Sequence, residues 1–212
     1  MLKQLKNRRQ AGDTLIEVLF AVTVFSLVVV TSLTLMNQGT SASLRSLQIT
    51  LVRQEIDSQA ETLRFLNSSY VAAYYPGYNP NITDPTSTPA EQYFKIISDV
   101  KAKGATSVSA FGADGDKCQK APTGSFVVNS RAALYQKYDI TKISEADTFP
   151  QIVYGGGTTI TTSKGIWIEA VRSAPANGTS YVDFHIRACW YAPGTGLPMN
   201  LGTIVRLYEP AN

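Results

Sequence analysis

Histidine, the side chain that most often performs acid–base chemistry near neutral pH, occurs once in this chain of 212 residues. His185 lies between Asp183 and Arg187, in a segment where polar and apolar residues alternate. A catalytic histidine needs a nucleophile or a proton-accepting partner that the fold brings within reach, and the sequence pattern offers no matching set. The pattern favours a structural or surface histidine, and we predict that the chain is not an enzyme.

Asp114 and Asp116 are close enough in sequence to supply oxygen ligands to one calcium ion. The residues that follow them lack the rest of an EF-hand-like ligand set. We therefore expect a plain turn at this point, and we predict neither a metal ion nor another cofactor.

One carboxylate occupies an unusual position. Glu17 is the only charged residue between Leu15 and Met36, a segment dominated by Leu, Val, Ile, Phe and Ala. In a helix this segment extends about 33 Å, close to the hydrocarbon thickness of a bilayer. A charge inside hydrocarbon costs about 3 kcal/mol on insertion scales, so we expect Glu17 to find a partner. The alternative is a capping box, in which Thr14 caps the helix and Glu17 follows three residues later.

The residues that flank this segment predict its orientation. Lys3, Lys6, Arg8 and Arg9 precede it without an acidic residue, so the N-terminus should stay cytoplasmic and the chain after Met36 should lie outside. The alternatives are a buried helix of a soluble protein and a cleaved secretory signal. The length of the apolar segment disfavours both, and no strong small-x-small cleavage site follows it. The rest of the chain has 15 basic and 16 acidic residues, which gives little support to general nucleic-acid binding.

The helical pattern continues beyond the apolar segment, and no proline occurs from Asp13 to Tyr75. We predict one helix over residues 14–66, about 80 Å long. Its second half carries one apolar stripe among charged residues, and this stripe requires a packed partner. The stripe consists of Leu44, Leu47, Leu51, Val52, Ile56, Leu63 and Leu66.

The remaining chain predicts a sheet that covers this stripe. An irregular connection is expected over residues 67–90, and a short helix over 90–103. Alternation with a period of two in residues 181–191 gives one buried face, and short connections between successive strands predict an antiparallel meander. The fold class is α+β, a long N-terminal helix whose second half packs on an antiparallel sheet. Strands are predicted over residues 125–129, 165–172, 181–191 and 203–209.

The residues around Glu17 also carry a resemblance to a known family. The run Gly12-Asp13-Thr14-Leu15-Ile16-Glu17-Val18 resembles the cleavage signature of type IV pilins and pseudopilins. In that family a membrane peptidase cuts after a glycine, the new N-terminus is methylated, and a Thr-Leu-Ile-Glu run places a glutamate fifth in the mature chain. Gly12 matches the glycine and Glu17 matches the glutamate, whereas Asp13 stands where the family usually has phenylalanine.

The resemblance implies a prepilin with three parts: a leader over residues 1–12, a long helix over 13–66 that spans the membrane at about 15–36, and a globular head over 67–212. It implies that Glu17 pairs with the N-terminal amine of a neighbouring subunit. The implied partners are other pilins, a prepilin peptidase, an assembly platform protein and an assembly ATPase. The subunit would sit in the membrane before assembly and in a cell-surface filament afterwards.

Three functions remain open at this stage. The first is a type IV pilus subunit for adhesion, motility or DNA uptake, in which case nucleic acid is a partner only in uptake; the chain length favours a minor subunit. The second is a pseudopilin of a type II-like secretion system. The third is a membrane-anchored extracytoplasmic binding protein or enzyme whose helix is not cleaved.

Cys118 and Cys189 are the only cysteines. The predicted orientation places both outside the cytoplasm, where disulfides persist, so we expect one disulfide between them. It would pin the polar, turn-rich segment around Cys118 to the strand that carries Cys189. The alternative is two free thiols.

Overall fold

The computed structural model of the chain forms two compact units, residues 1–44 and 45–212. The second unit, hereafter the head, therefore includes the second half of the long helix as well as the residues that follow it. Gly12, Asp114 and Asp116 lie outside the residues that the structure describes, as do the side chains of Asp13 and Thr14. The described residues are 13–74, 88–103, 107–108, 117–131, 143–157, 159–176, 178–194 and 196–210.

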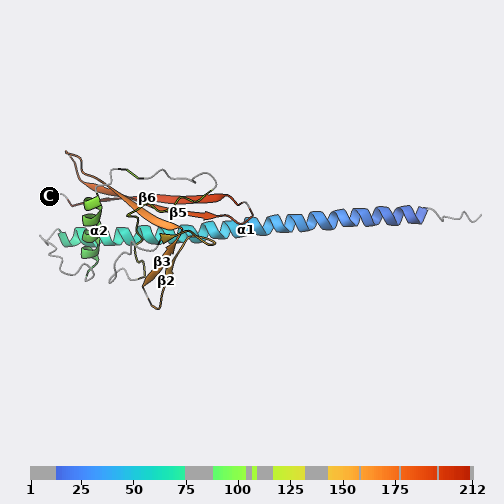
Figure 1. Ribbon diagram of the computed structural model, residues 1–212, viewed down its shortest axis with the longest axis horizontal. Coiled ribbons are helices and arrows are strands. Elements are labelled where there is room, and N and C mark those ends of the chain that lie inside the picture. The colour runs from blue at the N-terminus through green and yellow to red at the C-terminus, as the bar shows by residue number, and fades with distance from the viewer. Residues whose placement is uncertain are drawn as a thin grey trace, which may run out of the picture. The chain divides into compact units, whose positions relative to one another are not determined.

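The long helix α1 (Asp13–Tyr74) ends at Tyr74 rather than at Leu66 (Figure 1). Its last two turns were expected to be irregular because they are rich in Asn, Ser and Tyr. They are helical because Tyr70 packs its ring 5.6 Å from that of Tyr93, on the second helix. Tertiary packing thus overrides a weak local preference.

The inner face of α1 is the centre of the head. Val52, Ile56, Leu63 and Leu66 are buried at helical spacing, as predicted, and Tyr70 extends the same face. Full burial of each aliphatic side chain contributes about 1.5–3 kcal/mol relative to exposure. This face of α1 meets both the second helix and the sheet within one hydrophobic core.

The start of the predicted stripe was wrong. Leu44, Leu47 and Leu51 are exposed on α1, by 52%, 55% and 36% respectively. Leu47 and Leu51 are one turn apart, and both lie on a side of the helix other than the one that carries Val52 and Ile56. The buried face of α1 therefore begins at Val52.

The second helix, α2 (Pro89–Lys103), agrees with the prediction to within one residue. Thr88 accepts hydrogen bonds at its N-terminus: the Glu91 amide donates to its hydroxyl oxygen at 3.3 Å, and the Gln92 amide to its carbonyl oxygen at 3.1 Å. Apolar residues three and four apart bury one side of α2 in the core. These are Tyr93, Ile96, Ile97 and Val100.

The main sheet is the predicted antiparallel meander, with strand order β4-β5-β6 (Figure 1). The strands are β4 (Ile166–Ser173), β5 (Tyr181–Tyr191) and β6 (Pro198–Tyr208). β6 begins at Pro198, five positions before the expected start at Thr203. The alternate residues of β5 that were predicted to be buried are buried: Val182, Phe184, Ile186, Ala188 and Trp190. The long helix and this sheet confirm the predicted α+β fold class.

A second, smaller sheet was not predicted. Its strands are β1 (Ile143–Ser144), β2 (Gln151–Tyr154) and β3 (Ile160–Lys164), in the order β1-β3-β2. β1 is parallel to β3, and β2 is antiparallel to it. Gly165 joins this sheet to β4 with φ +65°, and a Cβ there would lie 2.6 Å from the Cys189 carbonyl oxygen, so only glycine fits.

The segment 125–129 was predicted as a strand, but it forms an isolated bridge between Phe126 and Ile168. The backbone groups of Val128, in the same segment, bond to a side chain instead of a neighbouring strand. The Gln59 amide nitrogen donates to the Val128 carbonyl oxygen at 2.7 Å, and the Val128 amide donates to the Gln59 side-chain oxygen at 2.7 Å. Gln59 is fully buried, so α1 binds this segment as a neighbouring strand would.

We predict that Gln59→Leu destabilises the head by about 2–4 kcal/mol, because it leaves the buried N–H and C=O of Val128 without these partners. The measurement is the free energy of unfolding in urea. Gln54→Leu, at an exposed position on the same helix, is the matched control and should change it little. An equal effect of the two substitutions would contradict this role of Gln59.

Candidate functional site

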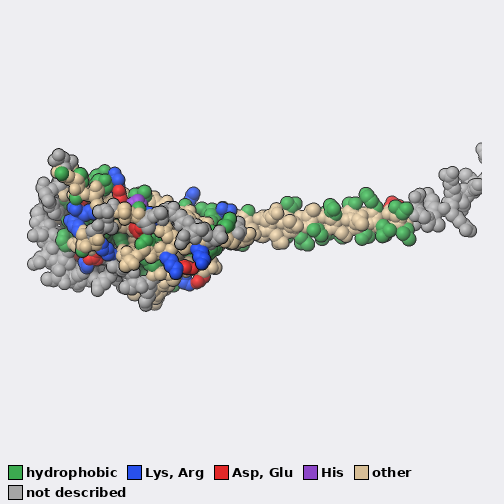
Figure 2. All heavy atoms as spheres, turned by 45° about the horizontal axis from the view of Figure 1, so that its top comes forward, with side chains coloured by type: hydrophobic (Ala, Val, Ile, Leu, Met, Phe, Trp, Pro, Cys, Tyr) green, Lys and Arg blue, Asp and Glu red, His purple; other side chains and the backbone are tan. Residues whose placement is uncertain are grey.

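The first half of α1 exposes its apolar side chains all round. Leu15, Phe20 and Phe25 are each more than 65% exposed, and Figure 2 shows hydrophobic side chains spread along this part of the helix. Its most apolar window has a mean hydropathy of 2.5, and none of that window is buried. The helix is therefore long and apolar enough to span a membrane once.

Four hydroxyl groups within this half bond to the helix itself. The side chains of Thr23, Ser26, Thr31 and Thr34 donate to carbonyl oxygens three or four residues earlier, at 2.7–2.9 Å. Each hydroxyl can thus enter hydrocarbon without an unmet donor. Ser and Thr in an apolar helix commonly bond in this way, so the sequence alone could have predicted it.

Glu17 lies one turn after Asp13, the first residue of α1, and it is exposed. Within the part of the chain that the structure describes, its carboxylate has no hydrogen-bond or ion-pair partner. Glu17 is also the only charged residue between Leu15 and Met36. Gly12 and the side chain of Thr14 lie outside the described residues, which leaves the cleavage site and the capping box as predictions.

The disulfide between Cys118 and Cys189 is present, with Cα atoms 5.6 Å apart and a sequence separation of 71. It ties the segment 117–131 to β5, on the face of the sheet opposite the main core. Both cysteines are buried, and they pack with Trp167 in a small second cluster. A cross-link over this separation stabilises a domain by about 4 kcal/mol in the chain-entropy model.

A buried ion pair lies beside this cluster, and the sequence analysis did not identify it. Arg187 donates to Glu169 at 2.8 Å, and the Trp167 indole nitrogen donates to the same carboxylate oxygen at 2.9 Å. The strand register explains the pairing, because Trp167 lies opposite Arg187 and Glu169 opposite His185. Side-chain exposure is only 5% for Arg187 and 9% for Glu169. Loss of one partner would therefore leave a buried charge unpaired.

His185 lies on the same face of β5. Burial lowers the pKa of His185, and the charge of Arg187 lowers it further, so the imidazole is neutral at pH 7. Within the described residues no three His, Cys, Asp or Glu side chains come together to hold a metal ion. Asp114 and Asp116 lie outside those residues.

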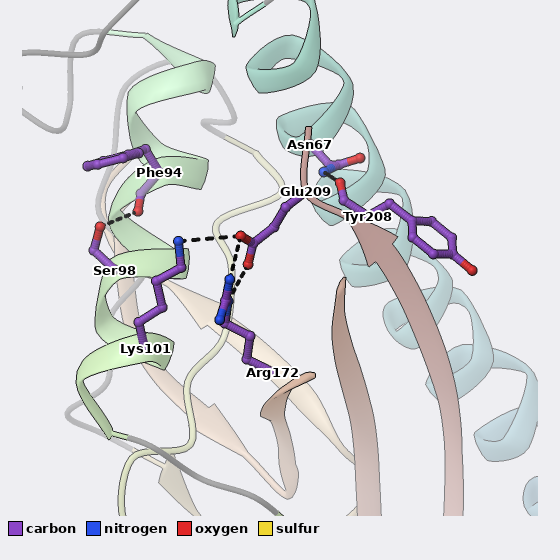
Figure 3. A network of polar contacts seen from close by, with 7 residues as sticks. All are labelled: Asn67, Phe94, Ser98, Lys101, Arg172, Tyr208 and Glu209. Atoms are coloured by element: carbon purple, nitrogen blue, oxygen red, sulfur yellow. Dashed lines mark hydrogen bonds and ion pairs between the residues drawn. The ribbon is translucent and has the colours of Figure 1, made fainter. Parts of the chain in front are cut away.

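A second polar network ties the end of the chain to three elements (Figure 3). Arg172 of β4 donates to both oxygens of Glu209, at 2.5 and 2.9 Å, and Lys101 of α2 lies 3.3 Å from the same carboxylate. Asn67 of α1 donates to the Tyr208 carbonyl oxygen at 3.2 Å. Tyr208 at the end of β6 is thereby fastened to α1, and Glu209, which follows it, is fastened to α2 and β4.

No protein-family model, no curated protein and no solved structure matches this chain.

The network around Glu209 predicts a pH dependence of stability. Burial raises the pKa of the Glu209 carboxyl, but the hydrogen bonds and charges of Arg172 and Lys101 outweigh this effect, so the pKa lies below its ordinary value of 4.5. The folded state thus binds this proton less readily than the unfolded state. The stabilisation is complete well above pH 4.5 and is lost as the pH falls through the lowered pKa.

We predict that Glu209→Gln reduces the free energy of unfolding at pH 7 and flattens its decline below pH 4.5. The measurement is urea unfolding at a series of pH values. Glu61→Gln is the control, because Glu61 forms only an exposed ion pair with Arg64 on α1 and should leave the pH profile unchanged. A Glu209→Gln profile that is parallel to the wild type would contradict the assignment.

Proposed function

We propose that the chain is a prepilin, the precursor of a structural subunit of a type IV pilus filament that serves adhesion, motility or DNA uptake. The observation that carries the proposal is the position of Glu17. Glu17 is the only charged residue between Leu15 and Met36, one turn into an exposed apolar helix that begins directly after Gly12, and a basic segment precedes that glycine. A membrane anchor alone has no need of a charge at this position.

The chemistry of assembly accounts for this charge. Cleavage after Gly12 would create a free amine on Asp13, and Glu17 would then lie one helical turn from it. The amine of one subunit and the carboxylate of another form an ion pair that offsets the desolvation of both groups. Such a pair sets the axial register between neighbouring helices, because the Asp13 amine and the Glu17 carboxylate lie at fixed positions on every subunit.

The exposed apolar surface also fits an assembly function. Before assembly, lipid surrounds the first half of α1, and after assembly the helices of other subunits replace it. The hydroxyls that bond to their own helix permit both surroundings. The chain acts by association rather than by catalysis, and its expected partners are other pilins, a prepilin peptidase, a platform protein and an assembly ATPase.

The sheet and the disulfide fit a head that works outside the cytoplasm. A disulfide such as that between Cys118 and Cys189 forms and persists in an oxidising compartment, and it would be reduced in a reducing one. Four basic residues before the apolar segment favour the matching orientation. The head would then form the outer surface of the filament.

We predict that Glu17→Val is inserted and cleaved but enters filaments at least about tenfold less than the wild type, since loss of about 1.4 kcal/mol per contact corresponds to a factor of ten. The measurement is the amount of subunit in sheared filaments relative to membranes, in cells that carry the cognate assembly machinery. Glu61→Val removes an exposed carboxylate from the same helix and should assemble normally. Normal assembly of Glu17→Val would refute the register function and leave helix capping as the explanation of Glu17.

A further inference from the structure

A cavity of about 620 Å³ opens beside the disulfide of the head. Its walls come from separate parts of the chain: the segment 118–121, β1 with the residues that follow it, the end of β3, and the start of β4. Gly165 lies between β3 and β4 at this point, where no other residue fits. The fold and the disulfide together hold these walls in place.

Among the described residues, the rim of the cavity carries two groups of each charge. Lys120 and Lys164 supply positive groups, and Glu145 and Asp147 supply negative ones. Lys164 forms an ion pair with Asp147, whereas Lys120 and Glu145 are exposed. The described lining residues thus present hydrogen-bond donors and acceptors side by side, and their formal charges cancel.

Apolar surface completes the lining. Ala121, Ile143 and the disulfide contribute to it, and Trp167 lies behind them, 1% exposed. A volume of this size is within the range of about 300–1,000 Å³ that is typical of small-ligand sites. Such sites combine an apolar wall with a few polar groups, and this cavity has both.

From this arrangement we propose that the cavity binds a neutral sugar unit of a glycan. A pyranose ring offers apolar C–H faces, and each of its hydroxyls both donates and accepts, so it can use lysine donors and carboxylate acceptors at once. An anion would meet Glu145 and Asp147, and a cation would meet Lys120 and Lys164, so a charged ligand gains little net attraction. The proposal concerns the head alone and does not depend on filament assembly.

The test uses the full chain in micelles of a zwitterionic detergent, because sugar-based detergents would compete for the site. Saturation-transfer NMR is recorded with the methyl glycosides of glucose, galactose, mannose and N-acetylglucosamine. We expect transfer to at least one of these four neutral probes. Glucuronate and glucosamine serve as the anionic and cationic comparisons, and each should show weaker transfer than the neutral probe that binds.

Two variants locate the binding. Ser144→Trp places a large ring in the cavity and should abolish the transfer, while the bond from the Gly165 amide to the Ser144 carbonyl oxygen is kept. Glu145→Lys gives the rim a net charge of about +2 and removes one charged acceptor, which should raise the Kd of the neutral probe about tenfold. Asp57→Lys changes an exposed carboxylate that does not line the cavity, and it should leave the Kd unchanged.

Three results would overturn the proposal: no transfer to any neutral probe, stronger transfer to glucuronate or glucosamine, or transfer that persists in Ser144→Trp. Near-ultraviolet circular dichroism of each variant checks that the head has folded. If Ser144→Trp does not fold, the comparison of Glu145→Lys with Asp57→Lys decides, because both substitutions lie at exposed positions. Equal Kd values for these two variants would then refute binding at the cavity.

Discussion

The head depends on one face of one helix. Val52, Ile56, Leu63 and Leu66 of α1 bury the apolar face of the β4–β5–β6 sheet, and within the same face Gln59 bonds both backbone groups of Val128. Because apolar burial is not directional, the aliphatic residues alone would hold the sheet without selecting one alignment. The two bonds of Gln59 add a fixed position, since a shift of α1 by one residue would leave three buried polar groups unpaired.

The same helix must also be stable in a different solvent. Its first half has no buried side and no charged residue from Val18 to Leu44, so water is a poor environment for it. A lipid bilayer can cover these apolar side chains in a single chain. In an assembly of many chains, a bundle of identical helices can cover them. The Glu17 carboxylate costs free energy in the bilayer. In a bundle of helices it stabilises the contact, provided that it pairs with an amine. This difference links a membrane-spanning helix to a proposed filament subunit.

Much of the fold could be predicted because its signals are periodic. Apolar residues continue over many turns of α1, and apolar and polar residues alternate along the whole of β5. Short connections between the strands indicated the antiparallel order of the main sheet. The second sheet escaped prediction because its strands have two to five residues, too few for a period to appear. Gln59, Glu169 and Arg187 escaped for another reason: each is polar and buried, and its pairing depends on contacts between elements that sequence spacing does not reveal. The two cysteines were predictable as a pair because the sequence has no others.

The central claim is that α1 becomes an assembly helix when the chain is cut after Gly12. Mass spectrometry of the intact subunit, isolated from the membranes of cells with the cognate peptidase, tests this claim directly. The account predicts a mature chain that starts at Asp13, and an uncut chain when Gly12 is replaced by arginine. A mature chain that starts near residue 40 would prove a secretory signal, and an uncut wild-type chain would prove a permanent anchor; either result would contradict the account.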